Sequence, residues 1–264
     1  MDYQLITVKT QDRVVVVTMN VPEKLNGTSA PMQAEIRHAL ACAEQDPQIR
    51  ALVLTGAGRA FCAGADLDAI RAQGDAQAQA EATYRGMQEF SNPLILALQE
   101  TRLPVVAALN GIAAGAGARL ALARDIVVAA RSASFLLPFA PRLGLVPDLG
   151  GSWLMPQLVG RARALGACLL GDRISAEQAL QWGMIWQLVE DEQLQEAALA
   201  LATRLAATPR HAALELRRAF DRASQQSLAE QLDYEAQRQR QLLATDEFQE
   251  GLAAFMERRA PEFA

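Results

Sequence analysis

The chain has 264 residues, a hydrophobic content of 51% and a formal net charge of −5 at pH 7, which suits one large domain or a domain with an appendage. It contains no run of basic residues, no secretory leader and no apolar stretch of roughly 18–20 residues, so we expect a cytoplasmic protein that binds neither nucleic acid nor membrane. The three cysteines are widely spaced and lack CxxC spacing, which argues for a reducing compartment and against a disulfide framework or a zinc site, so we expect no metal.

Strand and helix signals alternate in the first part of the chain. The β-branched segment over 13–20 predicts a strand, and residues 26–46 predict a helix with Ser29 as its N-cap and Pro31 in its first turn. A second buried strand, over 51–56, follows and ends at a glycine. A strand, a helix and a strand in this order predict a crossover unit with parallel pairing.

The middle of the chain continues this alternation with shorter signals. Residues 72–82 contain few large apolar side chains, so we expect a mobile surface segment with weak helical character, followed by a helix over about 84–100. Buried strands are predicted over 104–111 and 125–130, and the intervening residues 111–123 are glycine-rich and then helical. These segments bring the expected buried strands to four.

The pattern becomes helical after Gly151. Residues 174–184 open with Ser175 and carry Gln178 three positions later, which predicts a helix with a capping box. Gly183 suits the C′ position just after the end of that helix. The chain thus changes here from alternating strand and helix to helix alone.

Three further helices are predicted between about 192 and 258. The last, over roughly 246–258, places four large apolar side chains on one face: Phe248, Leu252, Phe255 and Met256. No Pro- or Ser-rich linker separates this region from the rest. We therefore expect a mixed α/β core over residues 1–190 and a helical region over residues 191–264 that packs on the core or reaches out of it.

Residues 55–67, TGAGRAFCAGADL, are the first candidate for chemistry. A glycine-rich turn after a buried strand can point backbone N–H groups at an anion. The GAGRAF portion resembles part of a dinucleotide fingerprint, but the third glycine and the acid after a second strand are missing. A tight turn without a ligand is the alternative, and Cys62, which has no evident histidine partner, is interpreted as a packing residue.

Residues 110–123, NGIAAGAGARLALA, are the second candidate. Small residues at the start of a helix allow close backbone approach, and the free N–H groups there favour negative charge. Helix packing through small residues is an equally good reading of the local sequence. Because both candidate turns are rich in N–H groups, one N–H from each could form an oxyanion hole.

The third candidate is the turn over 144–153, GLVPDLGGSW, in which Asp148 is the only acid. Asp148 is either the N-cap of a helix that begins near Gly151 or a carboxylate in an apolar wall. In the second case desolvation would raise its pKa and make it a competent proton acceptor and donor. Local spacing leaves both open. The only two histidines, His38 and His211, lie near no Ser or Cys signature, so nucleophilic catalysis is not indicated.

Six stretches match motifs of one known family in the right order: NVPEKLN, LTGAGRAFCAGADL, NGIAAGAGARLALARDIVVAARSASF, GLVPDLGGSWLMPQLVGRARA, GDRISAEQALQWGMIWQLV and GLAAFMERRAPEF. Over essentially its whole length the chain resembles the crotonase (enoyl-CoA hydratase/isomerase) family. The resemblance implies an α/β fold, with a crotonase-like spiral of ββα units and a C-terminal helical trimerisation region. It also implies an acyl-CoA thioester substrate, no cofactor beyond the coenzyme A of that substrate, and a homotrimer or dimer of trimers.

The same resemblance implies the site residues. In the family two backbone N–H groups hold the thioester oxygen and stabilise the enolate, and they map to Ala65 and Ala116. Positions that contact coenzyme A map to nine residues: Lys24, Leu25, Ala63, Ala65, Asp66, Leu67, Gly117, Phe255 and Arg258. The last two would come from a neighbouring subunit, although Phe255 could instead pack in the core and Arg258 could be a solvated residue of a last helical turn.

Both glutamates of the family hydratases are missing. One position is occupied by Arg119, and the segment that should hold the other, 136–144, contains no acid. Asp148 lies where isomerases of the family can carry an acid, and one carboxylate suffices to move a proton between two carbons. The resemblance therefore implies a CoA-thioester isomerase. An enoyl-CoA hydratase with unusual acids and a non-catalytic CoA-binding homologue remain alternatives.

Within the family, three stretches are most similar to a group of isomerases of phenylacetate catabolism: 114–133, 143–156 and 175–189. That group rearranges ring-1,2-epoxyphenylacetyl-CoA to oxepin-CoA, and its relatives shift enoyl-CoA double bonds, as in fatty acid metabolism. A one-residue extension around 138–141 departs from the family pattern and lines the expected acyl pocket, so the acyl group stays open.

Overall fold

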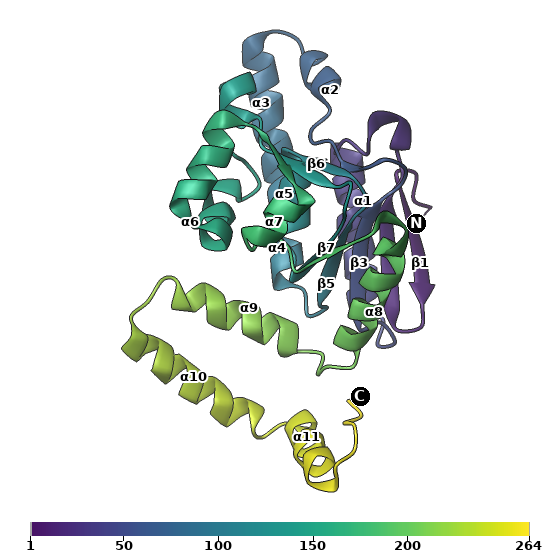
Figure 1. Ribbon diagram of the computed structural model, residues 1–264, viewed down its shortest axis with the longest axis vertical. Helices are drawn as coiled ribbons and strands as arrows, with labels where there is room; N and C mark the ends of the chain where they lie inside the picture. The colour runs from purple at the N-terminus through teal and green to yellow at the C-terminus, as the bar shows by residue number, and fades with distance from the viewer. Residues whose placement is uncertain (1, 264) are drawn as a thin grey trace.

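A computed structural model describes residues 2–263, and at its centre lies a large sheet (Figure 1). The sheet has six strands in the order β1-β2-β3-β5-β7-β10: β1 (Ile6–Gln11), β2 (Val14–Met19), β3 (Ala51–Gly56), β5 (Val105–Leu109), β7 (Ile126–Ala130) and β10 (Gln187–Val189). β1 pairs with β2 antiparallel, and all other neighbours are parallel. The four predicted strands and the parallel pairing of the first two are confirmed. The sequence patterns did not predict β1 or β10.

A second, smaller sheet has the order β4-β6-β8-β9: β4 (Ala60–Cys62), β6 (Ile112–Ala114), β8 (Ser134–Leu136) and β9 (Arg173–Ser175). Its first three strands are parallel, and β9 is antiparallel to β8. β4, β6 and β8 directly follow β3, β5 and β7, so each repeat adds one strand to each sheet before a helix follows. This arrangement is the expected spiral of ββα units.

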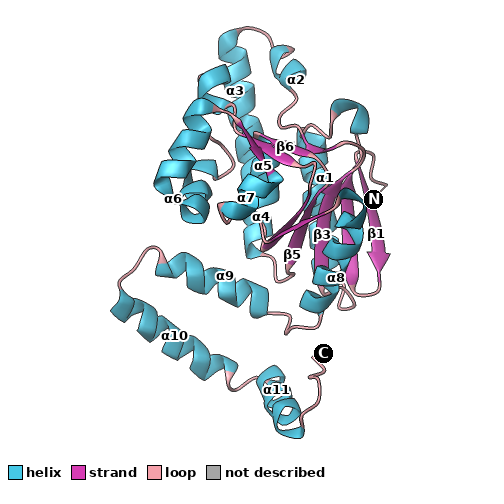
Figure 2. Ribbon diagram, viewed as in Figure 1, coloured by secondary structure: helices cyan, strands magenta, loops and turns pink. Residues whose placement is uncertain are grey.

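Helices surround the two sheets (Figure 2). α1 (Ala30–Gln45) contacts β1 and β2, and α8 (Leu194–Ala206) contacts β2, β3, β5 and β7. α1 begins as predicted, because the Ser29 hydroxyl accepts a hydrogen bond from Met32 N at 3.4 Å. Buried apolar side chains recur along α1 at the spacing of one helix face, and this face packs on the strands.

The chain between β4 and β5 is almost entirely helical: α2 (Leu67–Arg71), α3 (Ala76–Gly86), the π-helical turn η2 (Met87–Ser91) and α4 (Asn92–Glu100). The sequence predicts only weak helical character over 72–82, but α3 is a regular helix. Asp75 starts it by accepting a hydrogen bond from Ala78 N at 2.9 Å. The helix predicted over about 84–100 is present, and it contains the π-helical turn.

Three helices and three short turns complete the core: α5 (Ala116–Leu122), α6 (Gly151–Leu170), α7 (Ala176–Gln181), η1 (Pro22–Lys24), η3 (Phe139–Leu143) and η4 (Asp191–Gln193). The predicted cap of α7 is confirmed, because the Ser175 hydroxyl accepts from Gln178 N at 3.2 Å. Gly183 has a φ of +78°, as a C′ glycine requires. Among the described residues the full capping box is found at Ser227 and Glu230 instead.

Four helices, not the predicted three, follow residue 191 in the described chain: α8, α9 (Ala212–Ala223), α10 (Leu228–Leu242) and α11 (Asp246–Glu257). The linkers at 224–227 and 243–245 contain no glycine, the usual stop signal, so the boundaries are weak in sequence. α8 packs on the large sheet, whereas α9, α10 and α11 lie to one side of the core (Figure 1). The division at 190 and 191 stays a prediction.

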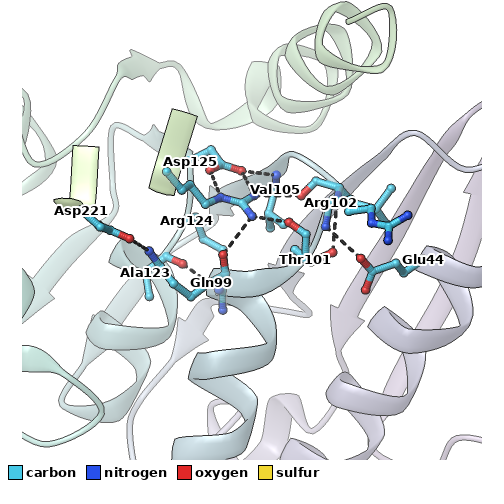
Figure 3. Close-up of polar contacts among 11 residues, drawn as sticks. Glu44, Gln99, Thr101, Arg102, Val105, Ala123, Arg124, Asp125 and Asp221 are labelled. Carbon is cyan, nitrogen blue, oxygen red and sulfur yellow. Dashed lines mark hydrogen bonds and ion pairs between the residues drawn. The ribbon is translucent and has the colours of Figure 1, made fainter. Parts of the chain in front are cut away.

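Arg217 anchors α9 to the core. Its guanidinium donates to both carboxylate oxygens of Asp125 at 2.6 Å and to three carbonyl oxygens near the start of β5: those of Gln99, Thr101 and Leu103. Asp125 also accepts a hydrogen bond from Val105 N at 2.7 Å, and Gln99 donates to Asp221 at 2.8 Å (Figure 3). One cation therefore satisfies three carbonyls at the end of α4 and in the loop that leads to β5.

Replacing Arg217 with Met should lower the free energy of unfolding by about 2–4 kcal/mol, because the change leaves a partly buried carboxylate and three carbonyls without their donor. The side chains of Arg217 and Asp125 are only 11% and 19% exposed. Urea denaturation at fixed protein concentration measures the effect. The neighbouring pair of Arg218 with Glu100 is 49% and 63% exposed, so Arg218→Met should cost less than about 1 kcal/mol. Equal losses in the two variants would contradict the anchor.

Candidate active site

Three segments of the sequence meet at one cavity of about 710 Å³. The first turn contributes 63–67, the second contributes Gly115 and Ala116, and the third contributes Asp148 and Leu149. The wall is completed by α2, α3 and the π-helical turn η2, with Ile70, Met87 and Phe90 among its apolar side chains. The structure therefore brings together the three segments that the sequence singled out.

The first turn follows β4 and is held by its backbone. Ala63 N donates to Leu25 O at 3.0 Å, and Thr28 N donates to Gly64 O at 2.7 Å. Gly64 has a φ of +101°, and a Cβ there would lie 2.9 Å from the carbonyl oxygen of Ala114. Glycine is required because the turn is left-handed and touches the next strand.

The second turn packs directly on the first. Gly115, with a φ of +49°, leads from β6 into α5, which begins at Ala116. A Cβ on Gly117 would lie only 2.1 Å from the carbonyl oxygen of Cys62, so no larger residue fits this contact. Burial raises the pKa of the Cys62 thiol to about 11, which agrees with a packing role. Backbone contact between the turns thus depends on glycine at 117.

Two residues that line this cavity, Ala65 and Ala116, have backbone amides without an acceptor in the described part of the chain. Within residues 2–263 neither Ala65 N nor Ala116 N donates a hydrogen bond to another protein atom. Ala116 is the first residue of α5, where the N–H has no partner within the helix. A Cβ on Gly64 would lie 3.7 Å from Ala116 N, so the two turns bring these amides close together. Such a pair can stabilise an oxygen that carries negative charge.

The third turn places Asp148 on the cavity wall. The helix that follows begins at Gly151, as predicted, but its N-cap is Gly150 and no side chain caps it. Asp148 contributes to the start of this helix only through its main chain, because its carbonyl accepts a hydrogen bond from Gly151 N at 2.7 Å. The carboxylate oxygen Oδ1 is buried and has no hydrogen-bond partner. The N-cap alternative is therefore wrong for the Asp148 side chain.

Burial dominates the electrostatics of Asp148. Desolvation raises the pKa of its carboxyl above the ordinary value, and this shift is opposed first by the backbone N–H of Asp148 itself and then by the charge of Arg119. Arg119 is 1% exposed and donates from Nη2 to Leu149 O at 3.3 Å. Burial lowers the pKa of Arg119 to about 10, with Asp148 as the main opposing charge. The sequence identified Arg119 only as a replacement for a glutamate, and its contact with the Asp148 turn comes from tertiary packing.

Two other acids line the cavity, and they differ from Asp148. Asp66 accepts hydrogen bonds from Ala69 N at 3.0 Å and from Lys24 Nζ at 3.2 Å, and these bonds lower its pKa. Glu89 belongs to the π-helical turn η2 and is exposed. The sequence did not single out Glu89, because the register of a π-helical turn is not visible in a helical pattern. Only Asp148 combines burial with an unpartnered oxygen.

The residues expected to contact coenzyme A fall in two places. The 63–67 turn lines the cavity, and Lys24 and Leu25 contact this turn through an ion pair with Asp66 and a hydrogen bond with Ala63. Gly117 packs on Cys62, just before the turn. Phe255 and Arg258 lie instead at the end of α11, far from α2 in Figure 1. Phe255 is 80% exposed, which excludes core packing within this chain. Their contact with coenzyme A stays a prediction that involves a neighbouring subunit.

A family profile described as enoyl-CoA hydratase/isomerase matches residues 9–264 of the chain. The chain belongs to this family. A relative from Escherichia coli K12, 1,2-epoxyphenylacetyl-CoA isomerase, is 46% identical over 95% of this chain and 94% of its own length. A probable enoyl-CoA hydratase from Rhodobacter capsulatus is 41% identical over 100% of this chain and 99% of its own length. The crotonase resemblance is confirmed.

Solved structures of the family agree with the fold. An enoyl-CoA hydratase from Polaromonas sp. JS666 superposes with a TM-score of 0.92 at 32% identity and covers 98% of this chain and 99% of its own. The chain is therefore an enzyme of the enoyl-CoA hydratase/isomerase family, which acts on acyl-CoA thioesters. Among residues 2–263 no helix is long and apolar enough to cross a membrane, and no three His, Cys, Asp or Glu side chains group as metal ligands.

Proposed function

We propose that this enzyme is an acyl-CoA thioester isomerase in which Ala65 N and Ala116 N hold the thioester oxygen and Asp148 transfers a proton. One observation carries the proposal: a half-buried carboxylate with an unpartnered oxygen shares a cavity with two amides that have no protein acceptor. No cofactor is required beyond the coenzyme A of the substrate.

The proposed reaction moves one proton. Asp148 removes it from a carbon near the thioester, and the electron pair left behind is delocalised onto the thioester oxygen, where the two amides stabilise the charge. The protonated carboxyl then returns the proton to another carbon of the same chain, which shifts the double bond. Hydration would also need a group that activates water, and the position of one hydratase glutamate holds Arg119, which is buried and donates a hydrogen bond to the Asp148 turn.

The name of the Escherichia coli relative supports a finer proposal for the acyl group. We propose ring-1,2-epoxyphenylacetyl-CoA, converted to oxepin-CoA in phenylacetate catabolism, with enoyl-CoA double-bond shift as a related activity. The apolar wall formed by Met87, Phe90 and Phe139 suits an aromatic or aliphatic acyl chain. Phe255 and Arg258 would complete the coenzyme A site of a neighbouring subunit in a homotrimer or a dimer of trimers.

A substrate panel separates isomerisation from hydration. Isomerisation of a 3-enoyl-CoA creates the conjugated 2-enoyl thioester and increases its absorbance, whereas hydration of crotonyl-CoA removes that absorbance. We expect turnover of the 3-enoyl-CoA and of the ring epoxide without a change in product mass. Hydration of crotonyl-CoA at a comparable rate, with the mass of one water added, would favour the hydratase. Binding of CoA without turnover of any substrate would favour the non-catalytic alternative.

A further inference from the structure

Helix α5 carries two groups of the proposed site one turn apart. Its first residue is Ala116, which lines the cavity, and Arg119 follows three positions later. Arg119 N donates to Gly115 O at 3.2 Å, so the Arg119 backbone is fixed in the first turn of the helix. A side chain at 119 therefore has a defined position relative to the proposed oxyanion hole.

The turn that carries Asp148 packs on the Arg119 side chain. Arg119 Nη2 donates to Leu149 O at 3.3 Å. A Cβ on Gly151 would lie 3.0 Å from Arg119 Cδ, and a Cβ on Gly150 would lie 3.8 Å from Arg119 Nη2. Leu149 and Gly150 are both left-handed, with φ of +48° and +74°. The guanidinium thus packs against a tight turn and donates a hydrogen bond to its backbone.

Few charged groups surround this pair. Arg119 Nε and Nη1 and Asp148 Oδ1 are buried and have no hydrogen-bond partner among the described residues. The charge of Asp148 raises the pKa of Arg119 against the larger effect of burial, and the thiol of Cys168 in α6 is neutral at pH 7 because burial raises its own pKa. Burial lowers the pKa of Arg124, which follows α5, and the charge of Arg119 lowers it further. Within residues 2–263 Arg119 is the one residue whose charge lowers the pKa of Asp148, against the larger effect of burial. A buried charge is less screened by salt than an exposed one.

We propose that Arg119 is a positioning residue for proton transfer: it holds the Asp148 turn through the Leu149 carbonyl and places a buried positive charge beside that turn. The inference rests on the proposed function where it assigns proton transfer to Asp148. The position that holds a glutamate in the family hydratases therefore has a different role in this enzyme, because Arg119 at this position acts on Asp148. Arg119 has no proposed contact with substrate and acts through Asp148.

The test measures the ionisation of Asp148 with and without the Arg119 charge. Infrared difference spectroscopy measures the protonation of Asp148 directly. The relevant band is the carboxylic acid C=O stretch that is present in the wild type and absent in Asp148→Asn. In Arg119→Met the midpoint of the titration of this band should lie about one pH unit or more above that of the wild type, because removal of a nearby opposite charge raises the pKa of a carboxyl by this amount. The acid limb of the kcat–pH profile should move in the same direction, because the base form is then lost at a higher pH.

Two further variants isolate the charge. Arg119→Lys keeps a cation and should leave the titration midpoint of the band within about half a pH unit of the wild type. This difference is small beside the shift that loss of an opposite charge produces. Arg161→Met removes an exposed arginine of α6 and should leave both readouts unchanged. If Arg119→Met fails to fold, Arg119→Gln takes its place in the comparison with Arg119→Lys.

Each result decides a different claim. A folded Arg119→Met or Arg119→Gln with an unshifted band would overturn the proposal, and so would an equal shift in Arg119→Lys. If Asp148→Asn keeps full activity while the band still follows the Arg119 charge, proton transfer by Asp148 is wrong but the electrostatic coupling stands. If Asp148→Asn is inactive and the titration of the band is the same in the Arg119 variants as in the wild type, proton transfer by Asp148 stands and only the positioning role of Arg119 is wrong.

Discussion

Asp148→Asn is expected to lower kcat for isomerisation by about 10²–10⁴-fold, the usual loss when a general base is removed. Asn keeps the size and the dipole of the side chain but cannot accept the proton. Binding of the CoA portion should change little, because Asp148 contributes no proposed contact to it. Steady-state kinetics with a 3-enoyl-CoA, together with calorimetric titration of CoA, measure the two quantities.

Two control variants make this prediction selective. Asp172→Asn introduces the same chemical change at an exposed residue after α6 and should leave kcat unchanged. Glu89→Gln tests another acid of the cavity wall. A large loss in Glu89→Gln together with normal turnover in Asp148→Asn would assign the proton transfer to Glu89 instead. In the wild type, burial should place the acid limb of kcat above the ordinary Asp pKa of about 3.9, as its raised pKa requires.

Gly117→Ala should damage both stability and turnover. The new methyl group would lie 2.1 Å from the carbonyl oxygen of Cys62 and 2.8 Å from its carbonyl carbon, which are backbone atoms that cannot rotate away. The start of α5 must then move away from the first turn, and the amides of Ala65 and Ala116 separate. We expect kcat to fall by about 10²–10³-fold, as when one oxyanion donor is lost, and the free energy of unfolding to fall by about 1–3 kcal/mol.

Gly166→Ala is the matched control for this substitution. Gly166 lies within α6 and a Cβ there would meet nothing within 4 Å. Alanine should stabilise the helix by roughly 0.5–1 kcal/mol without an effect on kcat. Thermal unfolding and the same kinetic assay compare the two glycines. Normal turnover in a well-folded Gly117→Ala would show that the contact between the two turns is not needed for catalysis.

The long buried strands could be predicted from sequence because five or six β-branched and aliphatic residues in a row leave a clear signal. The three-residue strands β4, β6 and β8 could not, since so short a segment has no period. The turns after them were still visible through their glycines. The sequence therefore located the loops of the site more reliably than the sheet that carries them.

The site was predictable in composition but not in its contacts. Asp148 was evenly balanced between a helix cap and a reactive acid, and only the left-handed backbone at Leu149 and Gly150 moved the cap to Gly150. The contact between Arg119 and Leu149 joins residues thirty positions apart, so no local pattern contains it. Glu89 was missed because a π-helical turn changes which side chains face the cavity.

The two amides proposed to hold the thioester oxygen belong to the main chain. Substitutions at Ala65 or Ala116 therefore preserve the N–H donor whenever the new side chain fits. The hydrogen bonds to the thioester oxygen thus tolerate sequence changes at these two positions. The proton-transfer groups are side chains, so they can be exchanged one at a time by single codon changes. Substitutions at positions such as 119 and 148 can thus change the reaction that an enzyme with this fold catalyses, while the enzyme still binds the same class of thioester.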